Sequence, residues 1–173
     1  AVGYSAHGGD GTINTVMGSW AMDNASGQAD GCVAIGNSSL RGDLTADADG
    51  TVAVGRSALN VLTSGQKNVA LGYQAGLETT IGDSNIAIGY QALVGDGAFQ
   101  NDNNIAIGSA NPAGTLGAMG GQWATAASTN NVAIGTGSMA GVLNAANYNS
   151  GVGSFSLRDV TQGDENVGVG SYG

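Results

Sequence analysis

Residues 68–76 read NVALGYQAG and residues 85–93 read NIAIGYQAL, so nearly the same nine residues occur twice, seventeen positions apart. A catalytic motif is needed only once. A near-copy at a fixed spacing is typical of a segment that stacks on its neighbour along the chain. The pair therefore indicates a repeat protein.

Each copy of the repeat centres on a glycine that closes a triplet of mostly apolar residues. Ten such anchor glycines occur: Gly3, Gly18, Gly36, Gly55, Gly72, Gly89, Gly108, Gly135, Gly153 and Gly170. Most neighbouring anchors are 17–19 residues apart, with one interval of 15 and one of 27. The sequence thus predicts a single repeat array over residues 1–173. Because the chain begins and ends inside a repeat, we expect it to be a fragment of a longer fibre protein.

The positions before the anchor glycine are strongly patterned. Position −1 is always a sizeable apolar residue, −2 is Ala in seven of ten copies, −3 is Val or Ile in seven of nine, and −4 is Asn in seven of nine. An apolar triplet between Asn and Gly is too short for a helix and suits a short strand ending at a corner. We predict an all-β fold, a parallel β-roll (β-solenoid) of about ten coils of 17–19 residues, each with two short strands and two turns.

The two faces of the strand lead to a prediction about assembly. Positions −3 and −1 share one face and −2 has the other, and we expect the larger −3 and −1 side chains to fill the interior. The outward −2 row contains no polar residue, although a strand that is apolar on both faces is covered on both faces. Since Ala and Gly permit close approach, the sequence predicts that this row packs against identical chains in a homo-oligomer.

The anchor glycine and the Asn have expected structural roles. We predict a positive φ for the glycine, at a corner where a Cβ would clash. The Asn is expected to cap the preceding turn through its side chain. Stacked one per coil, the Asn side chains are expected to form a hydrogen-bonded ladder.

The N-[VI]-A-[IL]-G core resembles the head repeats of trimeric autotransporter adhesins, the YadA-like family. The variant at Gly72–Gly76 and Gly89–Leu93 is similar to repeats of bacteriophage tail-fibre proteins. The resemblance implies a left-handed β-roll, an intertwined homotrimer with Ala near the three-fold axis, and an extracellular place on a bacterial cell surface or a virion tail fibre. The long units, and Gly151 and Gly168 in place of Ala, depart from the adhesin pattern. The longer protein can be a bacterial adhesin or a phage tail fibre, and the Tyr-Gln-Ala variant favours the phage tail fibre.

Composition excludes several function classes. Thirteen acidic residues against four basic ones give a net charge of −9, so nucleic acid is not an expected partner. No apolar run is long enough for a membrane helix, and no membrane insertion is predicted. A single His (His7) and a single Cys (Cys32) leave no metal or Cys-x-x-Cys motif. We expect a non-enzymatic protein without a cofactor.

A column of Asp residues at position −6 has two interpretations. Asp occupies this position in five of nine copies: Asp30, Asp49, Asp83, Asp102 and Asp164. Asp is favoured in turns, where its side chain accepts local hydrogen bonds. A stacked column of carboxylates could instead be bridged by cations such as Ca²⁺. No metal site is assigned from the sequence.

Aromatic residues supply the candidate binding residues. Trp123 lies in the longest insertion, residues 109–130, and insertions in a solenoid form surface loops that often bind. An exposed Trp can stack on a sugar ring, or Trp123 can fold back over a coil edge. Tyr148 lies in a smaller insertion. A further set of aromatic residues follows the anchor glycines by one or two positions, and these are expected to pack between chains or between the roll and its turns: Tyr4, Trp20, Tyr73, Tyr90, Phe155 and Tyr172.

These observations predict a segment of a trimeric extracellular fibre that attaches to a host surface through a glycan or protein receptor. One alternative is a purely structural shaft without a ligand. Another is a fibre-borne glycan hydrolase with carboxylate catalysis in grooves between subunits. Loss of adhesion on replacing Trp123 distinguishes a binder from a shaft, and release of sugars identifies a hydrolase.

Overall fold

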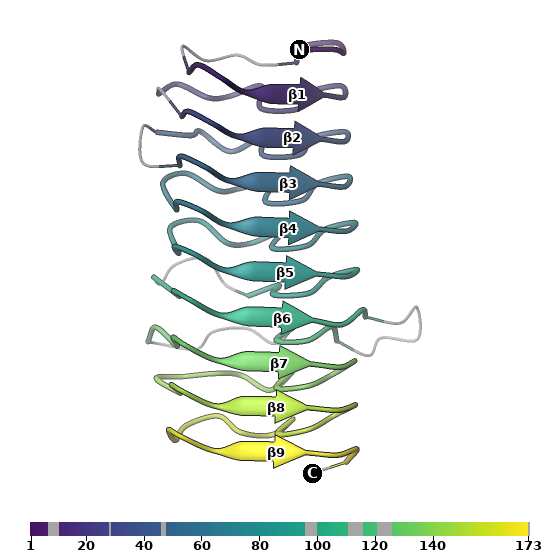
Figure 1. Ribbon diagram of the computed structural model, residues 1–173, viewed down its shortest axis with the longest axis vertical. Coiled ribbons are helices and arrows are strands. Elements are labelled where there is room, and N and C mark those ends of the chain that lie inside the picture. The colour runs from purple at the N-terminus through teal and green to yellow at the C-terminus, as the bar shows by residue number, and fades with distance from the viewer. Residues whose placement is uncertain are drawn as a thin grey trace.

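The computed structural model of the protein describes residues 1–6, 11–27, 29–45, 48–95, 100–110, 116–120 and 126–172. Figure 1 shows an elongated stack of short strands, with the chain ends at opposite ends of the stack. The strands within the described residues are β1 (Thr15–Met17), β2 (Val33–Ile35), β3 (Val52–Val54), β4 (Val69–Leu71), β5 (Ile86–Ile88), β6 (Ile105–Ile107), β7 (Val132–Ile134), β8 (Ser150–Val152) and β9 (Val167–Val169). This part of the chain contains no helix, and so no helix that could cross a membrane.

All nine strands form one parallel sheet in sequence order, from β1 to β9. The repeat positions set the register, because Ala70 pairs with Ala87 and Ala106 pairs with Ala133 across the longest interval. Val2 adds an isolated parallel bridge to Met17. The predicted all-β parallel solenoid is therefore confirmed, with about eight turns.

The expected second strand in each coil is wrong for the described residues. After most anchor glycines the chain runs through turns, with left-handed residues two and four positions on, such as Gln91 (φ 53°) and Leu93 (φ 53°). A backbone that returns repeatedly to positive φ cannot stay extended. Backbone hydrogen bonds still join neighbouring coils there; for example, Gly76 N–H donates to Ala92 O (2.9 Å). We call this part of each coil the return segment.

The predicted orientation of the strand is also wrong. The −2 residues point into the roll, and Ala34, Ala53 and Ala70 are fully buried within one chain. The −3 and −1 residues point outward and are half-buried or exposed in every strand. The Ala row is therefore covered within one chain, and the expectation that it packs against identical chains is wrong.

The interior is narrow, which explains this orientation. Large side chains of the return segments lie opposite the −2 row and are buried: Met22, Leu40, Leu59, Leu93, Met139. A Cβ added to Gly168 would lie 2.8 Å from Leu157 Cγ, and one added to Gly151 would lie 2.8 Å from Ser138 Oγ. Beside these return segments the −2 row holds Ala or Gly in every strand except β1, where Val16 is buried, and the larger −3 and −1 residues face outward.

The predicted positive φ of the anchor glycines and the predicted Asn ladder are both confirmed. All ten anchor glycines have a positive φ, between 121° and 156°, and a Cβ on Gly72 would lie 2.7 Å from Gly89 O. Asn85 N–H donates to Asn68 Oδ1 (2.9 Å), and the same contact continues through the later coils. The expectation that the Asn caps the preceding turn is wrong. Asn68 Nδ2 instead donates to Gly82 O (2.7 Å), in the turn of the following coil.

Candidate functional site

The outward −3 and −1 side chains form a continuous apolar stripe along the sheet, which we call the outer stripe. It runs over β1 to β9, and its residues are apolar in every strand except for Thr15 and Ser150. The exposed fraction of the side chain is 38% for Ile134 in β7 and 80% for Val169 in the last strand, β9. A long exposed apolar surface is typical of a protein interface. The outer stripe thus lacks a cover within the described residues.

The Asp column serves the coil stack. Asp83 Oδ1 accepts the backbone N–H of Gln66 (2.8 Å), and Asp102 Oδ1 accepts that of Asp83 (2.8 Å). Asp49 and Asp164 accept from the preceding coil in the same way (2.7 and 2.8 Å). This geometry favours the turn interpretation, because one oxygen of each of these carboxylates is occupied by the backbone. Within the described ranges, no three His, Cys, Asp or Glu residues are grouped to hold a metal ion.

Cys32 takes the place of a ladder Asn and is buried. Its Sγ donates to Ala48 O (3.3 Å), and its backbone N–H donates to Asn14 Oδ1 (2.8 Å). Burial raises the pKa of the thiol, and only the thiolate is a strong nucleophile. Cys32 is therefore a structural residue.

The two binding residues expected from the sequence are not brought into one described site. Trp123 lies outside the described residues, as does His7. Tyr148 is 61% exposed with φ 58°, and its N–H donates to Thr129 O (3.2 Å). This tyrosine stands directly before the ladder residue Asn149 and presents its ring to solvent.

The long insertion enters the array at a corner and leaves the stack in register. Leu93 N–H donates to Ala118 O and Met119 N–H donates to Ser138 O (both 2.9 Å), so Ala118–Met119 occupies the place of Ala92–Leu93 in the neighbouring coil. Ala118 follows its anchor glycine by ten residues, whereas Ala92 follows by three. The seven extra residues therefore lie between Gly108 and Ala118, and Leu116 is at their end.

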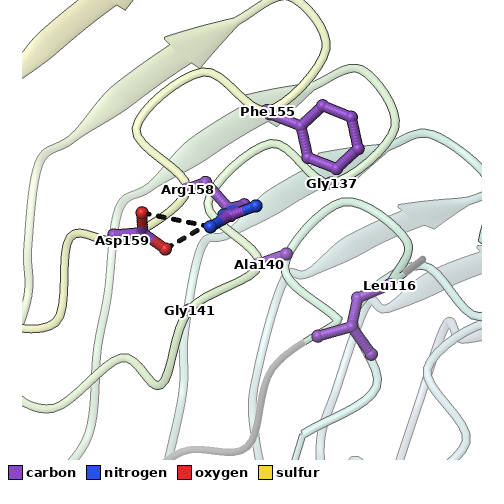
Figure 2. Close-up of a pocket in the computed structure, with 7 residues that line it drawn as sticks. All are labelled: Leu116, Gly137, Ala140, Gly141, Phe155, Arg158 and Asp159. Atoms are coloured by element: carbon purple, nitrogen blue, oxygen red, sulfur yellow. Dashed lines mark hydrogen bonds and ion pairs between the residues drawn. The ribbon is translucent and has the colours of Figure 1, made fainter. Parts of the chain in front are cut away.

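A pocket of about 400 Å³ opens beside Leu116, between this insertion and the next corners. Its lining comprises Leu116, Gly137, Ala140, Gly141, Phe155, Arg158 and Asp159. In Figure 2 the Phe155 ring, the Leu116 side chain and the Arg158–Asp159 pair lie around Ala140. Arg158 Nε donates to Asp159 Oδ1 (3.0 Å), which raises the pKa of the guanidinium. The pocket thus combines apolar walls with one neutral ion pair.

The aromatic residues of the corners pack on one another along the rod. Tyr73 and Tyr90 stack with ring centroids 5.3 Å apart, and Phe155 and Tyr172 do so at 5.3 Å. Tyr4 meets Trp20 edge to face. All three arginines of the chain lie over such rings: Arg41 over Trp20, Arg56 over Tyr73 and Arg158 over Phe155.

Sequence reasoning identified the aromatic positions but missed Leu116, Arg158 and Asp159. The available signal was Gly137. It is a glycine two positions after the anchor, where other coils carry a side chain, directly before the coil of Phe155.

Comparison of the chain with protein families, with curated proteins and with solved structures yields no match. What the fold defines is a class, that of parallel β-solenoid repeat proteins. The role of this chain within that class has to be inferred from the surfaces described above.

Proposed function

We propose that this chain is a non-enzymatic segment of a trimeric extracellular fibre that mediates attachment to a host surface, as part of a phage tail fibre or of a bacterial adhesin head. The outer stripe is the observation that carries the proposal. A rod with an apolar stripe along its whole sheet needs a partner of equal length and regular spacing, and identical chains meet both needs.

The outer stripe replaces the Ala row as the surface between chains. Its Val and Ile side chains are β-branched, which suits packing on a pleated surface. Burial of such side chains contributes roughly 25 cal/mol per Å² of apolar surface. The number of three chains and the left-handed sense rest on the resemblance of the N-[VI]-A-[IL]-G repeats to trimeric fibre proteins.

Trimerisation would leave the return segments and their corners facing outward, where they can meet a glycan or protein receptor. Each weak site would then occur three times on one rigid rod. Linked sites can raise overall affinity by 10²–10⁴ over a single site. Attachment in this account is a matter of rigidity and multivalency, without any chemical step.

A purely structural shaft is the second candidate, and the regularity of the stack favours it. The Asn, Asp and glycine columns all act between neighbouring coils. A shaft requires nothing more than such columns, and its receptor-binding tip would lie in another part of the parent protein.

Binding to whole surfaces distinguishes these candidates. Fluorescently labelled protein is added to a panel of bacterial cells and to animal cells and matrix-coated surfaces, and a variant that disrupts the outer stripe (Ile86→Ser with Ile105→Ser) is measured beside it. We expect the native assembly to bind one class of surface at least tenfold more tightly than the dissociated variant. Absence of binding to every surface by a stable native trimer would favour the shaft.

A further inference from the structure

Two adjoining hollows share Phe155, Arg158 and Asp159. The larger is the pocket of about 400 Å³ described above. The smaller, of about 230 Å³, is completed by Tyr172. Phe155 and the Arg158–Asp159 pair therefore stand between the two hollows, and an extended ligand of two units could occupy both.

The larger hollow exists because the repeat is interrupted in two places. Gly137 supplies no side chain at a position where Phe155 stands in the next coil, and a Cβ on Gly137 would lie 2.5 Å from Phe155 Cδ1. The ring of Phe155 thus lies over bare backbone. The corner insertion then adds Leu116, which is 45% exposed, as a further wall. A uniform shaft requires neither interruption.

The lining combines apolar surface with a small number of polar groups. Small-molecule sites are mostly apolar with a few placed donors and acceptors, and range from about 300 to 1,000 Å³. The ion pair engages two guanidinium N–H groups, Nε with Oδ1 (3.0 Å) and Nη2 with Oδ2 (3.4 Å). A guanidinium has five N–H donors and a carboxylate about four acceptor sites, so both partners retain capacity for a ligand.

The ligand chemistry follows from these groups. Because Asp159 neutralises Arg158, the site offers no net charge to an ionic group. Neighbouring donors and acceptors match the adjacent hydroxyl groups of a sugar, while the apolar body of Phe155 and the side chain of Leu116 match its C–H face. The chain's net charge of −9 also disfavours an acidic ligand.

We propose that these two hollows bind two consecutive neutral sugar rings of a surface glycan. The site deepens the attachment function and rests on it, since it names the receptor class and the residues that contact it. Phe155 forms the apolar wall that the two subsites share, and Arg158 and Asp159 bind the hydroxyl groups of the glycan.

The test uses ligand-observed NMR with the native protein and five probes: maltose, cellobiose, lactose, diacetylchitobiose and the acidic sugar sialyllactose. The variants are Phe155→Ser, Arg158→Asn and Gly137→Ser. Each introduces a residue that another coil carries at the equivalent position, namely Ser38 for the two Ser variants and Asn60 for the Asn variant. Tyr73→Ser is the matched control, because it removes a corner aromatic far from the hollows. Solution mass and circular dichroism confirm that each variant folds.

We expect at least one neutral disaccharide to bind with a millimolar Kd, and each of the three variants to weaken it at least tenfold while Tyr73→Ser does not. Failure of all neutral probes to bind, preference for sialyllactose, or unchanged binding by Phe155→Ser would overturn the site. Attachment to cells separates the two proposals. If the native protein and the Phe155→Ser variant attach to a surface equally well, the proposed function stands and this site is wrong. If the native trimer attaches to no surface, the proposed function itself is wrong.

Discussion

Asn131 donates both its backbone N–H and its side-chain Nδ2 to a single atom, Oδ1 of Asn104 in the preceding coil (3.0 and 3.1 Å). The same double contact joins Asn149 to Asn131 (3.0 and 3.1 Å). These three side chains are fully buried. A buried amide that satisfies the backbone of the next coil fixes the register of the stack, since an unpaired polar group there would be costly.

Replacing one ladder residue should therefore destabilise the stack strongly. In Asn104→Ala, Asn131 N–H loses its acceptor and Ser128 O loses its donor (2.8 Å in the native protein). We expect the free energy of unfolding in urea to fall by about 2–5 kcal/mol, because each buried unsatisfied group costs about 1–3 kcal/mol. The control is Asn37→Ala at an exposed corner, where we expect a loss below about 1 kcal/mol. Equal losses for the two variants would argue against the ladder.

The anchor glycines should be less tolerant of a side chain than other left-handed glycines. Gly72→Ala must accommodate a Cβ 2.7 Å from Gly89 O at φ 138°, whereas Gly31→Ala has φ 67° and no atom within 4 Å. We expect Gly31→Ala to cost about 1–2 kcal/mol through its backbone conformation alone. Gly72→Ala should cost at least twice that, measured by the same urea titration, since neighbouring coils must separate. A smaller cost for Gly72→Ala would contradict the stacked corners.

Cys32 gives a prediction about pH. Its thiol has a raised pKa in the folded protein because it is buried. Its contribution to stability is therefore complete below the ordinary thiol pKa of about 8.5 and is lost as the pH rises through the higher folded value. In Cys32→Asn the amide can take over the contact with Ala48 O and extend the ladder, which we expect to add about 1 kcal/mol at pH 7.

The difference in unfolding free energy between Cys32→Asn and the native protein should then grow as the pH rises above the ordinary thiol pKa of about 8.5. Thermal or urea unfolding at pH 7, 8.5 and 9.5, at one protein concentration, measures it. A difference that stays constant across this range would mean that the thiol does not titrate differently in the folded state.

The outer stripe can be weakened without altering the coil. Ile86→Ser with Ile105→Ser places at two −3 positions the residue that β8 naturally carries there, Ser150. We expect the double variant to keep its β-sheet circular dichroism and to dissociate at higher protein concentration than the native chain. Ile13→Ser is the control, since Ile13 is 89% exposed outside the sheet and Ser84 stands at its equivalent position. Equal dissociation of the two variants would show that assembly does not depend on the outer stripe.

Most of the fold could be predicted from the sequence because each coil repeats the same constraints. The Asn at −4 and the anchor glycine recur often enough to define strand, corner and register. The direction of the strand could not be predicted in this way. Alternation separates Ala70 from Val69 and Leu71, but only the volume of Leu59, Leu93 and similar return-segment residues decides which set fits inside.

The candidate site was less predictable for a related reason. Phe155 follows the repeat and was visible as a corner aromatic, whereas Leu116 reaches the pocket only because the insertion rejoins the stack at Ala118. Arg158 and Asp159 form a pair between adjacent residues, which no repeat pattern specifies. A site built where a repeat is interrupted becomes visible only once the coils are placed beside one another.

The central claim is that the outer stripe is a surface between identical chains. Light scattering after size exclusion measures the solution mass of the folded protein directly. We expect three times the chain mass of 16.8 kDa. A soluble, folded monomer at micromolar concentration would contradict the claim, because the outer stripe would then remain exposed to water along the whole sheet.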